Sequence, residues 1–181
     1  PFDKLEGTSN KLSTQMKATG EVMSIGRTLE ESLLKAIRSL ETGCCHLYSP
    51  KFDDYTEEAL LSYIHDATDD RIFAIAQLIR MGVDLSLIYN QTKIDNLFLE
   101  KFKNIVEFEA TLKNGKNDPD VLRAAKRLGY SDKYIGQVWG MNEKDVFRLR
   151  AKLGMFPVYK MIDTCASEFD SYVPYFYSTY E

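Results

Sequence analysis

The stretch GYSDKYIGQVWGMN (residues 129–142) decides the fold. It contains the same three-residue junction twice: a glycine, an apolar residue, and a side chain that can cap a new helix. A glycine accepts the left-handed turn that ends a helix, and a serine or asparagine then accepts hydrogen bonds from the next first turn. The same form occurs upstream as Gly82-Val-Asp84. Such junctions leave almost no loop, so they predict short helices packed at angles to one another.

Other helix starts carry caps of the same chemical kind. Thr28 can accept hydrogen bonds from a first turn, and Glu31, three residues on, completes a capping box. Thr56 precedes two glutamates, and Asp95 precedes a long amphipathic run. Asp118 precedes a proline, which suits the first helical position because a missing N–H costs nothing there. These caps predict a chain that is mostly helical.

Apolar residues recur at helical spacing between these caps. One face comprises Leu29, Leu33, Ala36, Ile37 and Leu40, and a second comprises Ile72, Phe73, Ile75, Ala76 and Ile79. The long run carries a wide stripe of Leu97, Phe98, Phe102, Ile105, Phe108 and Leu112. Residues 22–25, 157–162 and 172–177 instead look extended. We therefore predict a mainly α fold, a compact multi-helical domain with short extended segments at both ends.

Composition places the chain among globular proteins. Its 181 residues are 44% hydrophobic and 28% charged, and the formal net charge of −4 argues against a polyanion-binding protein. No run of about 20 apolar residues suits a membrane span, and the first residues lack a signal peptide, so we expect a cytoplasmic protein. An odd cysteine count fits a reducing compartment. The sequence starts without methionine and ends in aromatic residues, so we expect a piece of a longer chain.

Cysteines and histidines raise the question of a metal or thiol site. Cys44, Cys45 and His46 adjoin one another, but zinc ligands come in spaced pairs that converge on the metal. The only other histidine is His65. Cys165 has no histidine close in sequence to serve as its base. We therefore predict no metal site and no catalytic residue in this chain, and we expect Cys165 to be a small buried hydrophobe.

Residues 131–152 also have the shape of a helix-turn-helix, which leaves a nucleic-acid-binding module as an alternative function. The basic residues of the second helix are Lys144, Arg148, Arg150 and Lys152. In a DNA complex they would contact phosphates, but Glu143 and Asp145 place acid where base contacts would lie. Pairing of Asp145 with Arg148 is the ordinary explanation of these charges. Because no phosphate-binding glycine loop occurs either, the residues themselves indicate an interaction module rather than an enzyme.

Three collinear matches resemble one family. QMKATGEVMSIGRT (residues 15–28), followed by EESLLKAIRSL (30–40), resembles the end of the first ATP-grasp unit in carbamoyl-phosphate synthetase large chains. DRIFAIA (70–76) resembles the opening of the oligomerisation domain of that family. PVYKMIDTCASEF (157–169) and YFYSTYE (175–181) resemble the lead into the second ATP-grasp half. The chain departs from the family pattern chiefly in residues 44–56 and 113–118, which look like loops.

The resemblance implies a parent enzyme that is an ATP-dependent carbon–nitrogen ligase. Such an enzyme makes carbamoyl phosphate from bicarbonate, glutamine-derived ammonia and two ATP, for arginine and pyrimidine synthesis. The implied partners are the two ATP-grasp halves of the same chain, a small glutaminase subunit and other large chains in a homo-oligomer, with no membrane and no nucleic acid. ATP and Mg²⁺ or Mn²⁺ would bind the parent outside this chain, which itself would bind no cofactor or metal. Met16 and Glu21 fall at motif positions that border the carbamate passage in the family.

The same resemblance divides the chain into four parts. Residues 1–45 would be the C-terminal tail of the first ATP-grasp, or carboxyphosphate, unit, and residues 46–55 a linker. Residues 56–154 would form the helical oligomerisation domain. Residues 155–181 would be an extended lead into the second ATP-grasp unit. The implied function is that of a scaffold and oligomerisation segment, inactive by itself.

Overall fold

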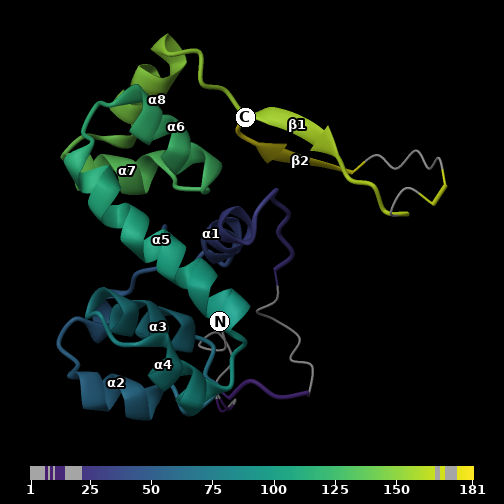
Figure 1. Cartoon of the computed structure of the whole chain (residues 1–181). Helices are drawn as coiled ribbons and strands as arrows, with labels where there is room; N and C mark the ends of the chain where they lie inside the picture. Colours follow the sequence, from purple (N-terminus) through teal and green to yellow (C-terminus); the bar gives the residue numbers. More distant parts are fainter. Residues whose placement is uncertain (1–6, 8, 10, 15–21, 166–167, 170–174) are drawn as a thin grey trace.

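The computed structural model describes residues 7, 9, 11–14, 22–165, 168–169 and 175–181 (Figure 1). The first helices are α1 (Leu29–Ser39), α2 (Glu57–Tyr63), α3 (Arg71–Arg80) and α4 (Leu85–Thr92), with a short 3-10 helix η2 (Pro50–Phe52) before α2. The later ones are α5 (Asn96–Asn114), α6 (Pro119–Arg127), α7 (Asp132–Trp139) and α8 (Glu143–Lys152). Two strands follow, β1 (Val158–Met161) and β2 (Phe176–Thr179). The predicted mainly α fold is confirmed.

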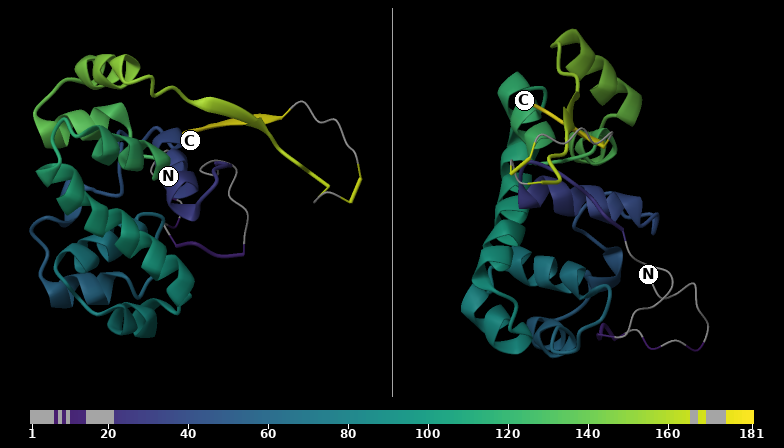
Figure 2. Two further views of the ribbon diagram at one scale, coloured as in Figure 1. Left: turned by 45° about the horizontal axis from the view of Figure 1, so that its top comes forward. Right: turned by 90° about the vertical axis from the view of Figure 1, so that its right-hand side faces the viewer.

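Helix α5 is the axis of the molecule. Its 19 residues run diagonally through Figure 1, with α2, α3 and α4 at one end and α6, α7 and α8 at the other. Helix α1 packs against α5 between the two groups, and both views of Figure 2 agree with this arrangement. Leu34 and Ile37 of α1 belong to the same buried cluster as the apolar faces of the other helices. Trp139 fixes α7 on α5 through a 2.7 Å hydrogen bond from its indole to the Leu112 carbonyl oxygen.

The junctions expected from sequence end and start helices as predicted. Gly82, Gly129 and Gly140 have φ angles of +83°, +94° and +65°, the left-handed region that glycine occupies without strain. After each of the latter two, Ser131 or Asn142 accepts a hydrogen bond from a backbone N–H of the following helix. The other predicted caps also accept from first-turn backbone N–H groups; they are Thr28, Thr56, Asp84, Asp95 and Asp118. Local sequence therefore sets the helix boundaries.

The predicted apolar stripe of α5 is partly wrong. The residues that α5 buries are Leu99, Phe102, Ile105, Val106 and Leu112. Leu97 and Phe98 are instead 60% and 43% exposed. Both lie in the first helical turn, where Asp95 caps the helix, and the buried face begins only with Leu99. The first turn of α5 therefore presents apolar side chains to solvent.

The extended segments at the C-terminal end form a hairpin. Strands β1 and β2 pair antiparallel, with Val158 opposite Thr179 and Met161 opposite Phe176. This confirms the extended segments expected there as far as they are described. The strand expected at residues 22–25 is wrong, since residues 22–26 take no regular secondary structure. The segment is held by side-chain contacts from α1 instead of by a neighbouring strand.

Among the described residues, none of the helices combines the length and the apolar character needed to cross a bilayer.

Candidate functional site at the junction of helix α1 and the terminal hairpin

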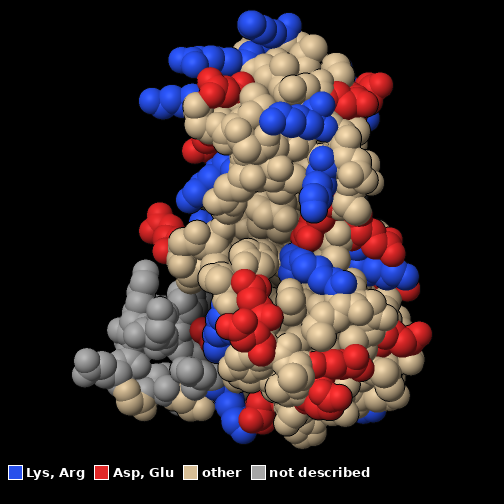
Figure 3. Space-filling model, turned by 90° about the vertical axis from the view of Figure 1, so that its left-hand side faces the viewer, with Lys and Arg blue, Asp and Glu red and all other residues tan. Residues whose placement is uncertain are grey.

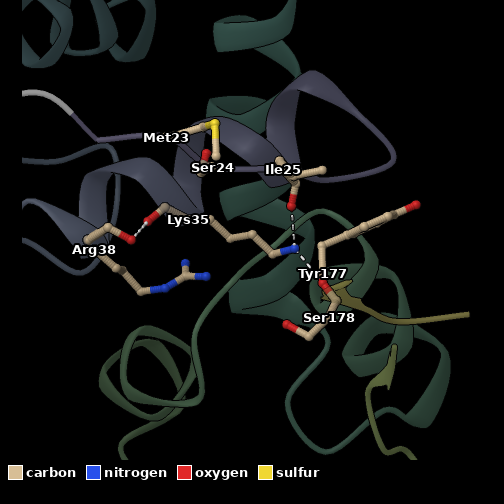
Figure 4. Close-up of a pocket in the computed structure, with 8 residues that line it drawn as sticks. Met23, Ser24, Ile25, Lys35, Arg38, Tyr177 and Ser178 are labelled. Carbon is tan, nitrogen blue, oxygen red and sulfur yellow. Dashed lines mark hydrogen bonds between the residues drawn. The ribbon is translucent and has the colours of Figure 1, made fainter. Parts of the chain in front are cut away.

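Lys35 of α1 connects the segment before α1 with strand β2 near the C-terminus. Its ammonium donates to the carbonyl oxygen of Ile25 at 2.8 Å and to that of Ser178, which lies 143 positions further along the chain (Figure 4). A third contact, 2.8 Å to Glu31, completes its three donors. The segment that enters α1 and the strand that ends the chain are therefore fastened to one side chain. We call the region where residues 22–28, α1, helices α6 to α8 and β2 meet the junction.

Glu31 is the buried carboxylate of the junction. Its side chain is only 2% exposed, and it accepts from the backbone N–H of Arg27 at 2.8 Å and from the Thr179 hydroxyl at 3.1 Å. The predicted capping box is therefore modified: Thr28 accepts from the Glu31 N–H as expected, but the carboxylate reaches one residue further back. Fully bonded carboxylates of this kind fix the geometry of the groups around them. Glu31 thereby locks the start of α1 to β2.

A second buried carboxylate, Asp132, lies at the start of α7. It pairs with Lys126 at 2.9 Å and with Arg150 at 2.7 Å, and all three side chains are at most 10% exposed. Burial lowers the pKa of Lys126, and the charge of Asp132 opposes that shift. The ring of Tyr180 covers both cations, with its centroid 5.0 Å from the Lys126 ammonium and 5.8 Å from the Arg150 guanidinium carbon. Asp132 therefore joins α6, α7, α8 and the end of the chain.

The α6–α7 turn touches α1 directly. A Cβ atom placed on Gly129 would lie 2.9 Å from the Glu31 Cα and 3.2 Å from its carbonyl oxygen. Glycine is thus needed here twice, for the left-handed turn and for the close approach of two backbones. Arg38 reinforces the contact, because its guanidinium donates to the Gly129 carbonyl oxygen at 2.7 Å.

Two cavities adjoin these contacts. One, of about 410 Å³, is shown in Figure 4 and is lined by Met23, Ser24, Ile25, Lys35, Arg38, Ser39, Tyr177 and Ser178. The other, of about 280 Å³, lies toward the α6–α7 turn and shares Lys35, Arg38 and Ser178 with the first. Figure 4 shows the Lys35 ammonium directed at the Ile25 and Ser178 carbonyl groups, with the Arg38 guanidinium beside it.

His46 belongs to a separate buried cluster that sequence reasoning missed. Its Nε2 lies 2.9 Å from the Glu109 carboxylate, which also binds Arg80, and its ring stacks on Tyr134 with centroids 3.7 Å apart. Burial lowers the pKa of His46, although its hydrogen bond to the Glu109 carboxylate opposes that shift. Burial also opposes ionisation of Glu109, but His46 and Arg80 outweigh it and hold its pKa below the ordinary value. The partners of His46 lie on helices that are distant from it in sequence, so no local sequence motif predicts the cluster.

Several residues singled out from sequence do not join the junction. Met16 and Glu21 lie outside the described residues. The Cys45 thiol contacts Gln137 at 3.6 Å, and none of the described residues form a group of three or more His, Cys, Asp or Glu that could hold a metal ion. The expectation that Cys165 is buried is wrong: it is partly exposed, in a turn where its N–H bonds the Asp163 carboxylate.

The helix-turn-helix shape is present, but two of the four basic residues of its second helix are paired with acids. Arg150 is 8% exposed and directed at Asp132, so it is not available to phosphates. Arg148 pairs with Asp145 at 3.0 Å, as expected from their spacing. Figure 3 shows basic side chains gathered at the end of the molecule formed by α6 to α8, with acidic side chains among them. These contacts do not favour the nucleic-acid alternative.

Comparison with known protein families gives one match, to residues 21–154. The matching family is described as the carbamoyl-phosphate synthetase large chain, oligomerisation domain. The match covers α1, all the later helices and the two buried carboxylates of the junction.

Proposed function

Because this chain belongs to the family of carbamoyl-phosphate synthetase large-chain oligomerisation domains, we propose that it is a scaffold segment of such a large chain. The parent is an ATP-dependent ligase that makes carbamoyl phosphate from bicarbonate, glutamine-derived ammonia and two ATP. In our proposal this product serves arginine and pyrimidine synthesis, and a small glutaminase subunit supplies the ammonia. The chain holds the two ATP-grasp units at a fixed separation. An enzyme that transfers intermediates between two active sites depends on the relative position of those sites.

The observation that carries this proposal is that Lys35 binds both the segment that enters α1 and the strand β2 near the C-terminus. In the proposed division, residues 1–45 end the first ATP-grasp unit, 46–55 link, 56–154 form the oligomerisation domain and 155–181 lead into the second unit. The Ile25 and Ser178 carbonyl groups then belong to segments that connect to different ATP-grasp units. A shared buried contact would fix the separation of those units. Met16 and Glu21 remain our proposed residues at the border of the carbamate passage.

The hairpin supplies a surface for an adjoining unit. Tyr159, Met161 and Phe176 are 71%, 46% and 56% exposed, and the strand register places them on one face. A two-stranded hairpin is marginal in water unless a further strand or helix covers it. We propose that the second ATP-grasp unit of the parent chain covers this face.

Self-association would use a different surface. Helix α4 and the first turn of α5 expose Leu87, Leu97 and Phe98, at 46%, 60% and 43%. The two helices pack on each other, so the exposed side chains belong to one end of the molecule (Figure 1). Exposed apolar groups of this kind mark protein interfaces. We propose that this end contacts a second large chain.

Nucleotide and metal chemistry would belong to other parts of the parent. The buried carboxylates Glu31 and Asp132 are bonded to lysine or arginine, so neither is free to ligate Mg²⁺ or Mn²⁺. These two carboxylates therefore do not fit an ATP–metal site, and we derive no catalytic step from them. The expected result is no bicarbonate-stimulated ATP hydrolysis by the purified chain. Measurable bicarbonate-dependent turnover would overturn the scaffold proposal.

Sedimentation velocity over a range of concentrations tests the self-association surface. The chain should form a reversible dimer or larger oligomer, and Phe98→Asp should shift it toward monomer. Phe156→Asp is the matched control, because Phe156 is also about half exposed, at 55%, but lies beyond α8. Equal weakening by both variants, or none by Phe98→Asp, would contradict the assignment of this surface.

A further inference from the structure

The junction carries more positive than negative charge. The basic residues of its segments are Arg27, Lys35, Arg38, Arg123, Lys126, Arg127, Lys133, Lys144, Arg148, Arg150 and Lys152. The acidic residues of the same segments are fewer; they are Glu30, Glu31, Asp120, Asp132, Glu143 and Asp145. Glu143 lines the smaller cavity but none of the described ion pairs includes it. The excess is local, because the whole chain has a formal charge of −4.

Arg38 is a cation of the junction that lines both cavities and that none of the described ion pairs includes. Its guanidinium is half-buried, and its one hydrogen-bond partner among the described residues is the Gly129 carbonyl oxygen. A guanidinium has five N–H donors in a planar fork, so most of them stay available. Burial lowers the pKa of Arg38, and the nearby charges of Glu31 and Asp132 only partly oppose that shift. A partly desolvated arginine of this kind is stabilised by an anion.

The available N–H donors of Arg38 lie at the two cavities of the junction. Arg38, Lys35 and Ser178 line both cavities, of about 410 and 280 Å³, and so form the wall between them. Lys35 has used its three donors and contributes charge only. Ser178 is bonded to Lys35 through its backbone carbonyl, and its hydroxyl makes no hydrogen bond to any of the described residues. Figure 4 shows this hydroxyl on the same side of the pocket as the Arg38 guanidinium.

We propose that the junction binds a small phosphate-type oxyanion between Arg38 and Ser178. The Arg38 guanidinium donates two parallel hydrogen bonds to the anion, and the Ser178 hydroxyl donates a third. The positive charge of Lys35 attracts the anion without a hydrogen bond. Bound there, the anion offsets the excess positive charge and connects α1 to β2 beside the Lys35 contact. This site is independent of the self-association surface, so either can fail without the other.

Titration of the 181-residue chain with inorganic phosphate, followed by backbone amide chemical shifts at constant ionic strength, tests the site. Saturable shifts are expected around Arg38 and Ser178, with one phosphate bound per chain. Arg38→Gln should weaken binding at least about tenfold, since a charge-assisted bidentate contact is lost. Arg148→Gln, which removes an exposed arginine of α8, should leave the affinity unchanged.

Acetate at matched ionic strength separates a tetrahedral anion from any carboxylate. Phosphate binding at least several-fold tighter than acetate supports the proposal, whereas equal or tighter acetate binding overturns it. Absence of saturable shifts at Arg38 and Ser178 in the unmodified chain also overturns it, and this result needs no variant. If Arg38→Gln does not fold, Arg38→Lys replaces it, with a weaker loss of affinity expected because charge remains but the fork is gone.

Discussion

The hydroxyl of Thr179 donates a 3.1 Å hydrogen bond to the buried carboxylate of Glu31, although 148 positions separate the two residues in the chain. One partner ends the terminal hairpin and the other lies in the first turn of α1. The contact is buried, so its donor cannot be replaced by water without rearrangement. The start of α1 and the end of the terminal hairpin are therefore one structural unit.

Thr179→Val removes this donor while keeping the shape of the side chain. Glu31 retains Arg27 and Lys35, so we expect the free energy of unfolding to fall by about 1–2 kcal/mol. Urea denaturation followed by circular dichroism measures the change. Ser178→Ala is the control, because the contact of Ser178 with Lys35 uses the backbone carbonyl and survives the substitution. A loss for Ser178→Ala as large as that for Thr179→Val would contradict this account.

Asp132→Asn should be far more damaging. It leaves Lys126 and Arg150 buried without a negative partner, and breaking a buried ion pair from one side costs about 3–5 kcal/mol. Asp145→Asn removes the acid of an exposed pair with Arg148 and should cost less than about 1 kcal/mol. Thermal unfolding of the two variants side by side gives the comparison. Similar losses in both would show that Asp132 does not act as a buried hub.

Gly129→Ala and Gly82→Ala form a matched pair. Both glycines have strongly positive φ angles, +94° and +83°, so alanine strains either backbone by about 1 kcal/mol. Only at Gly129 would the new methyl group meet the backbone of Glu31, at 2.9 Å, whereas nothing lies within 4 Å at Gly82. We expect Gly129→Ala to cost at least about 1 kcal/mol more than Gly82→Ala. Equal losses in urea denaturation would mean that α1 does not touch the α6–α7 turn.

Stability should depend on pH through His46. Burial lowers its pKa below the ordinary 6.5, despite Glu109, so the unfolded chain binds the proton more readily. The stabilising contribution is therefore complete above about pH 6.5 and is lost as pH falls through the lower folded value. The groups that face the ring are Glu109, Arg80, Tyr130 and Tyr134, and among the described residues its Nδ1 has no partner.

The free energy of unfolding at pH 7.5, 6.5 and 5.5 measures this dependence. His46→Phe keeps a ring against Tyr134 but cannot titrate, so its stability should change less between pH 7.5 and 5.5 than that of the unmodified chain. His65→Gln, on an exposed turn after α2, is the control. An unchanged slope in His46→Phe would show that other groups carry the pH dependence.

Sequence predicted the features that depend on neighbouring residues. The glycine turns and the caps from Thr28 to Asn142 need only local backbone geometry, and all of them formed. The side-chain partners of Glu31 were predictable only in part. Its place in the first turn of α1 follows from the capping pattern, but its contacts with Thr179 and Lys35 depend on how the chain returns to α1. Long-range contacts of this kind leave no periodic signal.

The errors in predicting which residues are buried also arise from contacts between residues far apart in sequence. Apolar spacing put Leu97 and Phe98 on one stripe with Phe102 and Ile105, yet both are exposed because the buried face of α5 begins at Leu99. His46 was judged only as a possible metal ligand, since its carboxylate partner is 63 positions away. Helix periodicity reports which residues share a face, but it does not report where the covering elements end.

The central claim is that Lys35 holds the entering segment and the hairpin in a fixed relation. Spin labels on cysteines replacing Met23 and Met161, both exposed, report this relation through their distance distribution once Cys44, Cys45 and Cys165 are replaced by serine. We expect one narrow distribution in the otherwise unmodified chain and a broad one in Lys35→Met. A distribution that stays equally narrow after Lys35→Met would contradict the claim.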